Sequence, residues 1–176
     1  MGDGTTGERT RLRVRDAVAE DWPLIWPFWH EIVAAGDTYA WDPRADEATA
    51  RSLWMAPGSR VFVVEDPEAT GAPDRIVASA SVRPNYGGPA RTVANAGFMV
   101  SPAHAGRGIG RLLATHVLDE ARRDGYTAMV FNAVVETNPA LRLWQSLGFT
   151  VLGTVPAAFD HPRHGPVGLH ILHRFL

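Results

Sequence analysis

Three glycines alternate where a β-rich run of the sequence passes into a long amphipathic helix pattern. They are Gly106, Gly108 and Gly110, within the segment VSPAHAGRGIGRLL. Glycine lets backbone N–H groups approach an anion closely, and the first N–H groups of a helix are unpaired and favoured by the helix dipole. The segment therefore predicts either a tight strand-to-helix connection or a cradle for a pyrophosphate group, to which Arg107 would add a charged contact.

The spacing of these glycines excludes a dinucleotide-binding fingerprint of the G-x-G-x-x-G type, which also requires a βαβ unit. Here the glycine-rich segment follows three β-rich runs, at 60–66, 75–83 and 92–100. The two segments between these runs, EATGAPD and PNYGGPA, carry the Pro, Gly and Asn residues that are typical of hairpin turns. The pattern predicts an antiparallel meander.

The remaining elements follow from the periodicity of apolar residues. Helical spacing predicts helices at 19–35, 46–55, 108–124 and 139–146. Strands are predicted at 12–17, 127–135, 149–155 and 167–176, the last two on either side of a loop rich in His, Pro and Gly. We therefore expect a flexible tail at 1–10 and one α/β domain at 11–176, with a mixed, mostly antiparallel central sheet flanked by about four helices.

Composition narrows the possible partners. The chain has 176 residues, 17 of them basic and 19 acidic, and its formal charge of −2 gives no electrostatic reason to attract nucleic acid or an anionic membrane. The absence of cysteine excludes disulfide frameworks, thiolate metal sites and cysteine nucleophiles. No run approaches the roughly 18 apolar residues of a membrane span, and the first ten residues lack the apolar core of a signal peptide. We expect a cytoplasmic protein.

Aromatic residues are concentrated near the N-terminus, since four of the six tryptophans lie between Trp22 and Trp41. Trp22, Trp26 and Trp29 recur at helical spacing, so a core-facing helix surface is the simplest interpretation of these three. Tyr39 and Trp41 lie in the segment DTYAWDP, which has no periodicity. For these two side chains, the wall of a pocket is as good an interpretation as packing.

The glycine-rich segment resembles the acetyl-coenzyme-A loop of the GNAT superfamily of N-acetyltransferases, whose pattern is Arg/Gln-x-x-Gly-x-Gly/Ala after a V-x-P strand end. Val100, Pro102, Gly108 and Gly110 match this pattern. Ala105 stands where the family usually has Arg or Gln. One side-chain contribution to the pyrophosphate is therefore missing, while the backbone donors are unaffected.

A second segment, NPALRLWQSLGF, is similar to the family's N-x-x-A-x-x-L-Y-x-x-L-G-F helix and strand, which borders the pantetheine arm. It departs from that pattern in two ways: the interval from Asn138 to Trp144 is one residue shorter, and Trp144 replaces the common tyrosine. The resemblance implies acetyl-CoA as cosubstrate and no metal. It also implies a set of coenzyme-binding residues: Met99, Val100, His104, Ala105, Gly106, Arg107, Gly108, Ile109, Gly110, Asn138, Leu143 and Trp144.

Further segments are similar to a narrower group of small-amine acetyltransferases, which includes the azetidine-carboxylate and proline-analogue detoxifying enzymes. These segments are DTYAWDP, RPNYGGP, VANAGFMV, FNAVVETN and AAFDHPRHG. The resemblance implies that the strand before the coenzyme loop and the strand after the long helix splay apart and admit the thioester. It places Asn95 and Asn132 on these two strands as the catalytic and acceptor-binding residues, with Tyr39 and Trp41 in the acceptor pocket.

Acetyl transfer needs an unprotonated amine, donors for a developing oxyanion and a proton for the departing thiolate. The resemblance implies backbone N–H groups near Met99 and Val100 as the oxyanion donors. The segment ANAGFMV has no acidic residue, so water or one of the seven histidines is the expected base. His104 lies in the coenzyme turn, and four others lie in the last hairpin without the spacing of metal ligands: His161, His164, His170 and His173.

We therefore expect acetyl-CoA-dependent transfer to a primary or secondary amine of a small molecule, such as an amino acid or a toxic analogue of one. A homodimer is the expected assembly. Two alternatives stay open. One is acetyl transfer to a protein N-terminus or peptide. The other is a non-catalytic acyl-CoA-binding module, which Ala105, Trp144 and the missing acidic residue would suit.

Overall fold

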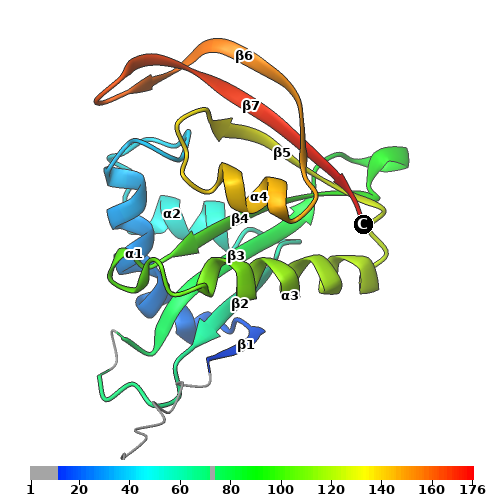
Figure 1. The fold of residues 1–176 in the computed structure, drawn as a ribbon. Helices are drawn as coiled ribbons and strands as arrows, with labels where there is room; N and C mark the ends of the chain where they lie inside the picture. Colours follow the sequence, from blue (N-terminus) through cyan, green and yellow to red (C-terminus); the bar gives the residue numbers. More distant parts are fainter. Residues whose placement is uncertain (1–11, 72–73) are drawn as a thin grey trace, which may run out of the picture.

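The computed structural model describes residues 12–71 and 74–176, so the tail expected at 1–10 lies outside the described residues. Seven strands form one sheet in the order β1-β2-β3-β4-β5-β7-β6 (Figure 1). The strands are β1 (Arg13–Asp16), β2 (Arg60–Glu65), β3 (Ile76–Pro84), β4 (Val93–Val100), β5 (Ala128–Val135), β6 (Thr150–His161) and β7 (Gly165–Phe175).

Every neighbouring pair of strands is antiparallel except β4 and β5, which are parallel. The parallel pairing is short, because it joins only Val93 to Ala128 and Ala94 to Met129. Beyond Ala94 the two strands have no pairing in the sheet. The mixed, mostly antiparallel sheet expected from the sequence is confirmed.

Four α-helices cover the sheet, as predicted: α1 (Trp22–Ala34), α2 (Glu47–Trp54), α3 (Ile109–Arg123) and α4 (Leu141–Ser146). None of the helices in the described part of the chain is long and apolar enough to cross a bilayer. The stretch predicted as helix from residue 19 begins instead as a 3-10 turn, Ala19–Asp21. α1 starts after Asp21, with proline in its first turn, where a missing N–H costs nothing.

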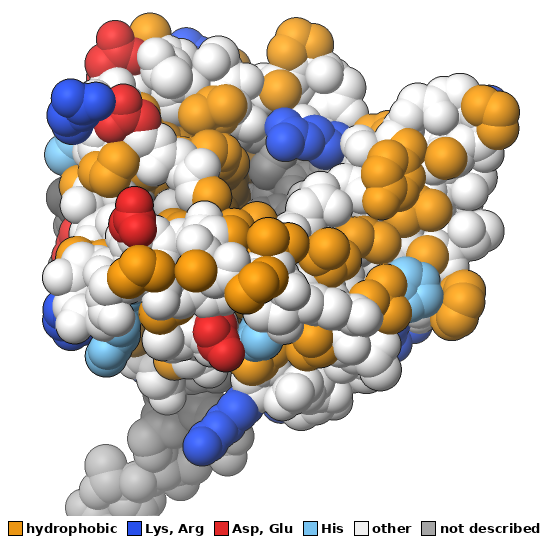
Figure 2. All heavy atoms as spheres, turned by 90° about the horizontal axis from the view of Figure 1, so that it is seen from above, with side chains coloured by type: hydrophobic (Ala, Val, Ile, Leu, Met, Phe, Trp, Pro, Cys, Tyr) orange, Lys and Arg blue, Asp and Glu red, His pale blue; other side chains and the backbone are white. Residues whose placement is uncertain are grey.

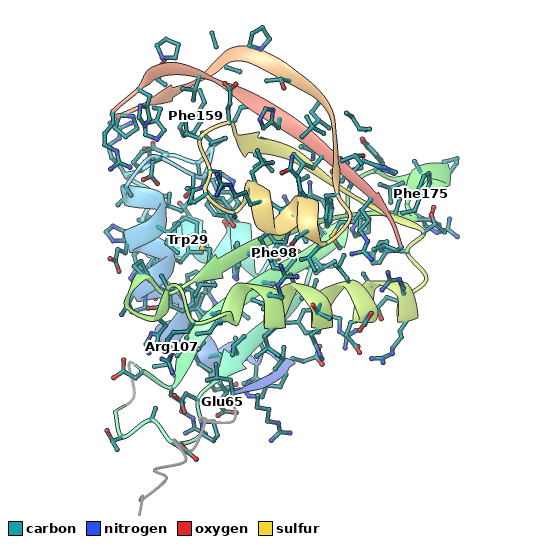
Figure 3. The ribbon with its side chains drawn as sticks, in the orientation of Figure 1. Trp29, Glu65, Phe98, Arg107, Phe159 and Phe175 are labelled. Carbon is teal, nitrogen blue, oxygen red and sulfur yellow. The ribbon has the colours of Figure 1, made fainter. Side chains whose placement is uncertain are left out.

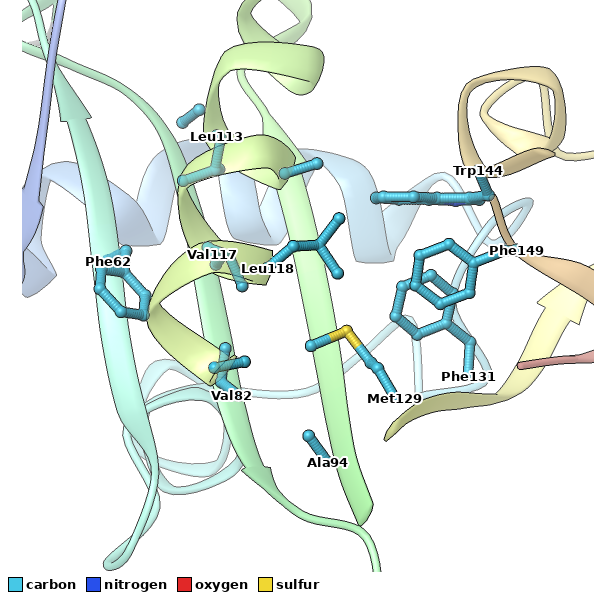
Figure 4. Close-up of a cluster of buried hydrophobic side chains, with 14 of the residues drawn as sticks. Phe62, Val82, Ala94, Leu113, Val117, Leu118, Met129, Phe131, Trp144 and Phe149 are labelled. Atoms are coloured by element: carbon cyan, nitrogen blue, oxygen red, sulfur yellow. The ribbon is translucent and has the colours of Figure 1, made fainter. Parts of the chain in front are cut away.

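The sheet is buried on both faces. On β2, Phe62 and Val64 belong to a core cluster with α3 and α4, whereas Val61 and Val63 belong to a second cluster with α1 and α2. Figure 4 shows part of the first cluster, in which Leu113 and Val117 of α3 lie over the sheet. Because successive residues of a strand point to opposite faces, this continuous apolar run fills both cores at once.

The C-terminal hairpin differs from the prediction of two strands around a long loop. β6 continues to His161 and β7 begins at Gly165, so only three residues connect them. Within β6 the register shifts between Val155 and Phe159, and Ala157 has a φ of 50°. The irregular residues therefore form a bulge inside the strand. Pro156 is tolerated there because β6 is at the edge of the sheet, where a missing N–H leaves no neighbour unpaired.

Candidate active site

The divergence of β4 and β5 opens one edge of β4 to a cavity of about 560 Å³. The cavity joins the start of α3 to the loop between α1 and α2. Almost all the residues expected at the site line it: Tyr39, Trp41, Asn95, Met99, Val100, His104, Ala105, Gly106, Gly108, Ile109, Gly110, Asn132, Asn138, Leu143 and Trp144. Arg107 is exposed beside the start of α3 and is not part of the lining (Figure 3).

The start of α3 has free backbone donors. The first helical bond runs from the Leu112 N–H to the Gly108 carbonyl at 3.1 Å, so the N–H groups of residues 109–111 have no helical acceptor. Gly106 and Gly108 have φ values of 76° and 77°, in the left-handed region, and no atom lies within 4 Å of where their Cβ atoms would be. The turn leaves the space and the donors that a pyrophosphate needs.

Close packing fixes this turn against the rest of the cavity. A Cβ on Gly110 would lie 3.4 Å from Leu143 Cδ2 and 3.7 Å from Val100 Cγ2. Glycine therefore lets α3 approach both α4 and the end of β4. The α3 start, the β4 edge and α4 together form the end of the cavity at which the sequence predicts the coenzyme.

Tyr39 occupies the open edge of β4. Its hydroxyl donates to the Phe98 carbonyl oxygen at 2.8 Å and accepts from the Phe98 N–H at 3.0 Å. Burial raises the pKa of Tyr39, so the phenol keeps its proton and acts as a donor. The sequence singled out Tyr39 as a candidate for the pocket wall but gave no sign of this contact, which spans 59 residues.

The register of β3 and β4 separates the two N–H groups expected to act as oxyanion donors. The Ser101 N–H donates to the Val77 carbonyl, and successive N–H groups of a strand point to opposite sides. The Met99 N–H is therefore directed at β3, opposite Ser79, whereas the Val100 N–H faces the open edge. Of the two, the Val100 N–H is placed to meet a ligand in the cavity.

A cluster of three asparagines bridges the splayed strands. The Asn85 Oδ1 accepts from Asn95 Nδ2 at 3.1 Å and from Asn132 Nδ2 at 2.6 Å, and Asn85 Nδ2 donates to Asn132 Oδ1 at 3.2 Å. Asn85 thus links Asn95 of β4 to Asn132 of β5, and both of these line the cavity. Sequence reasoning missed Asn85, whose only signal was its place in the turn segment RPNYGGP.

Aromatic side chains form another part of the cavity wall. Tyr39 stacks on Trp41 with ring centroids 4.7 Å apart, and Trp41 stacks on Trp29 at 5.4 Å. Trp41 therefore has both of the roles left open, pocket wall and packing. Trp22 and Trp29 are buried, as expected for a core-facing surface, while Trp26 is only half-buried.

Trp144 lies at the boundary between core and cavity. It is 7% exposed, and its ring centroid is 4.8 Å from that of Phe98. The Phe131 ring is 4.9 Å away by the same measure, on the core side shown in Figure 4. Asn138 is engaged locally, since its Oδ1 accepts from the Ala140 N–H at 2.9 Å in the turn before α4. Both residues line the cavity, and both also have structural contacts that need no ligand.

Ionisable groups are few in this cavity. Within the described lining there is no aspartate or glutamate, and His104 is the one histidine. The Nδ1 of His104 is buried and has no hydrogen-bond partner among the described residues. Of the histidines in the last hairpin, His161 accepts from the Arg163 N–H and His170 bonds Thr154. Across the described ranges no group of three His, Cys, Asp or Glu residues could hold a metal.

The turn before α3 offers free N–H groups to an anion, and it leads to the open edge of β4. This arrangement is typical of proteins that hold a phosphate-bearing coenzyme along one strand. The family comparison is more specific. The chain belongs to the acetyltransferase (GNAT) family, whose model matches residues 20–149.

Two solved structures are similar over most of the chain. A GCN5-related N-acetyltransferase from Kribbella flavida is 54% identical, with a TM-score of 0.86 over 94% of this chain and 98% of that one. The protein yncA from Salmonella typhimurium, solved with its cofactor acetyl-CoA, is 28% identical, with a TM-score of 0.76 over 94% of each chain. The acyl donor of the family, acetyl-CoA, is thus present in a relative with the same fold.

Two curated proteins match over shorter segments. The N-acetyltransferase aca1 of Schizosaccharomyces pombe is 34% identical over 137 residues, which are 72% of this chain and 66% of that protein. The L-methionine sulfoximine/L-methionine sulfone acetyltransferase of Salmonella typhimurium is 46% identical over 57 residues, 32% of this chain and 33% of that enzyme. The chain thus spans about two thirds and one third of these relatives.

Proposed function

We propose that this protein transfers an acetyl group from acetyl-CoA to a primary or secondary amine of a small molecule, an amino acid or an analogue of one. One observation carries the proposal. A single cavity connects the anion-binding turn at the start of α3 to the asparagine cluster between β4 and β5. Such a cavity can hold both reactants next to the same strand edge.

Acetyl-CoA supplies the acetyl group as a thioester. The amine nitrogen forms a bond to the carbonyl carbon, and the carbon–sulfur bond breaks. The amine loses a proton, and the departing thiolate gains one. The α3 turn holds the pyrophosphate, and the Val100 N–H donates to the carbonyl oxygen as its charge grows. Asn95 and Asn132 orient the acceptor. Because the described lining has no carboxylate, water or His104 removes the proton.

A small acceptor suits the walls of the cavity. Tyr39, Trp41 and Trp54 bound its acceptor end with aromatic surface. A polyamine or a basic peptide would instead call for acidic groups, which the described lining lacks. The similarity to an L-methionine sulfoximine and sulfone acetyltransferase supports the same class of acceptor.

The test is release of free thiol from acetyl-CoA across a panel of amines, amino acids and peptides. We expect thiol release with small amines and amino acids. Preferential acetylation of peptide N-termini would support the protein acetyltransferase instead. If acetyl-CoA binds and no acceptor releases thiol, the chain is a non-catalytic acyl-CoA-binding module.

We further propose that the protein forms a homodimer through β6. This strand is at the sheet edge, and Leu152 and Val155 expose 64% and 49% of their surface. Figure 2 looks onto this side of the molecule, which is hollowed and carries many hydrophobic side chains. Light scattering coupled to gel filtration tests this: a monomer at micromolar concentration would contradict it, and Leu152→Glu should shift a dimer toward monomer.

A further inference from the structure

Arg83 occupies the acceptor end of the cavity. It is near the end of β3, directly opposite Asn95 in the register with β4. Since alternate residues share a face, Arg83 is on the same face as Ser81 and Ser79, both of which bond Trp54 beneath the acceptor wall. Arg83 and Asn95 line the same cavity.

The charge of Arg83 has no acidic partner among the described residues. Two arginines of other strands are paired: Arg15 with Asp21 and Glu65, and Arg60 with Asp16, Glu120 and Asp124. Arg13 and Arg174 also make no ion pair among the described residues, but they are not in the cavity lining. Arg83 makes no ion pair in the described part of the chain, and the cavity lining there contains no aspartate or glutamate. A permanent cation thus faces a cavity whose described residues offer it no counter-charge.

Arg83 is far from the start of α3, where we propose that the coenzyme binds. Asn95 and Val100 are five residues apart on β4, which is about 17 Å along a strand. The pyrophosphate donors at the start of α3 are next to Val100, so they are at the far end from Arg83. Arg83 is therefore placed to meet the acceptor rather than the phosphates of the coenzyme.

The asparagine cluster has spare hydrogen-bonding groups near Asn95, which is opposite Arg83 in the register. Asn85 Oδ1 accepts from both Asn95 and Asn132, which leaves the Asn95 Oδ1 and further amide N–H groups free of partners within the cluster. A guanidinium binds a carboxylate with two parallel hydrogen bonds, and neighbouring amide N–H groups can donate to the same oxygens.

We propose that Arg83 binds the carboxylate of the acceptor and so restricts the enzyme to amines that carry one, such as amino and imino acids. The inference rests on the proposed acetyl transfer to a small amine and specifies its acceptor. Polyamines and other polycations are excluded by charge repulsion. The amine of such an acid is one carbon from its carboxylate, so the long Arg83 side chain has to extend along the β4 edge toward Val100 for the amine to meet the thioester.

The test compares two amino acids, L-methionine sulfone and L-proline, with their carboxamides, which keep size and amine but lose the negative charge. We expect the wild type to prefer each acid by roughly tenfold or more in kcat/KM, the range of a charged hydrogen bond. Arg83→Gln should remove that preference by raising the KM of the acids, with the carboxamides unchanged. Arg83→Lys keeps the positive charge but cannot make two parallel hydrogen bonds to a carboxylate, so its preference for the acids should be intermediate.

Arg91→Gln is the matched control, because Arg91 is an exposed arginine outside the cavity lining. Its kinetics should equal those of the wild type. Equal use of acids and carboxamides by the wild type, or an equal loss of both in Arg83→Gln, overturns the role of Arg83 and leaves the proposed function intact. If neither acids nor carboxamides are acetylated although acetyl-CoA binds, the proposed function itself fails.

Discussion

The hydroxyl of Tyr39 satisfies both backbone groups of Phe98, donating to its carbonyl and accepting from its N–H. At this point β4 has lost β5 as a neighbour, so the tyrosine takes the place of the missing strand. The contact links the aromatic wall of the cavity to the strand edge along which we propose that transfer occurs.

Tyr39→Phe should lower the free energy of unfolding by about 1–3 kcal/mol, because two buried backbone groups lose their partner while the ring stacking persists. The KM for the acceptor should rise as the β4 edge loosens. Chemical denaturation and steady-state kinetics measure the two effects. Tyr126→Phe is the control, since its hydroxyl makes no hydrogen bond to another described residue; equal behaviour of the two variants would argue against the role of the contact.

Gly108→Val should weaken acetyl-CoA binding by more than tenfold, about 1.4 kcal/mol, because its side chain would occupy the path of the pyrophosphate. Isothermal titration calorimetry measures the affinity. Gly125→Val is a matched control for backbone strain: Gly125 also has a positive φ, 87°, with open space around it, but it follows the other end of α3. A folded Gly108→Val protein with unchanged affinity would disprove the assignment.

Asn132→Ala and Asn95→Ala should raise the acceptor KM or lower turnover and leave the affinity for acetyl-CoA nearly unchanged. Asn85→Ala should do the same indirectly, because it holds the other two amides in place. If Asn85 acts through Asn132, the double variant loses less than the sum of the single losses. Additive losses, or an equal loss of acetyl-CoA affinity, would count against this arrangement.

Trp144→Phe should keep turnover within about tenfold, a barrier change of 1.4 kcal/mol, because Trp144 packs on Phe98 and Phe131 and an indole N–H is too weak an acid to protonate a thiolate. A larger fall in kcat with intact coenzyme affinity would show that the indole N–H takes part. Activity gained only in Trp144→Tyr, from an inactive wild type, would favour the non-catalytic module.

Acid stability should depend on Asp21. This buried carboxylate accepts from Arg15 at 2.7 Å, and the hydrogen bond from Arg15 lowers its pKa. The pair therefore stabilises the fold above the unfolded-state pKa, near 4, and this contribution is lost as the pH falls through the lower folded-state value.

Asp21→Asn should cost about 3 kcal/mol at pH 7, and its difference from the wild type should shrink below about pH 4. Urea denaturation across that pH range measures the change. Asp42→Asn, which removes an exposed pair with Arg44, should have little effect at any pH. A pH-independent loss in Asp21→Asn would show that packing, not charge, is what the substitution removes.

Local signals in the sequence determined the elements and the turn at which we propose that the coenzyme binds. The start of α3 depends on glycines within one turn, and its end on Gly125, so neighbouring residues specify both. The two-faced burial of β2 follows from its unbroken apolar run. These features depend only on residues that are close together in the chain, so they can be predicted from the sequence.

The contacts at the proposed acceptor end were decided by the tertiary structure. Tyr39 and Phe98 are 59 residues apart, Asn85 and Asn132 are 47 apart, and Arg83 meets Asn95 only through the register of β3 and β4. The conformational preferences of neighbouring residues cannot predict these contacts. The first two contacts occupy the space that opens where β4 and β5 diverge after Ala94, and they join segments that only the folded sheet brings together.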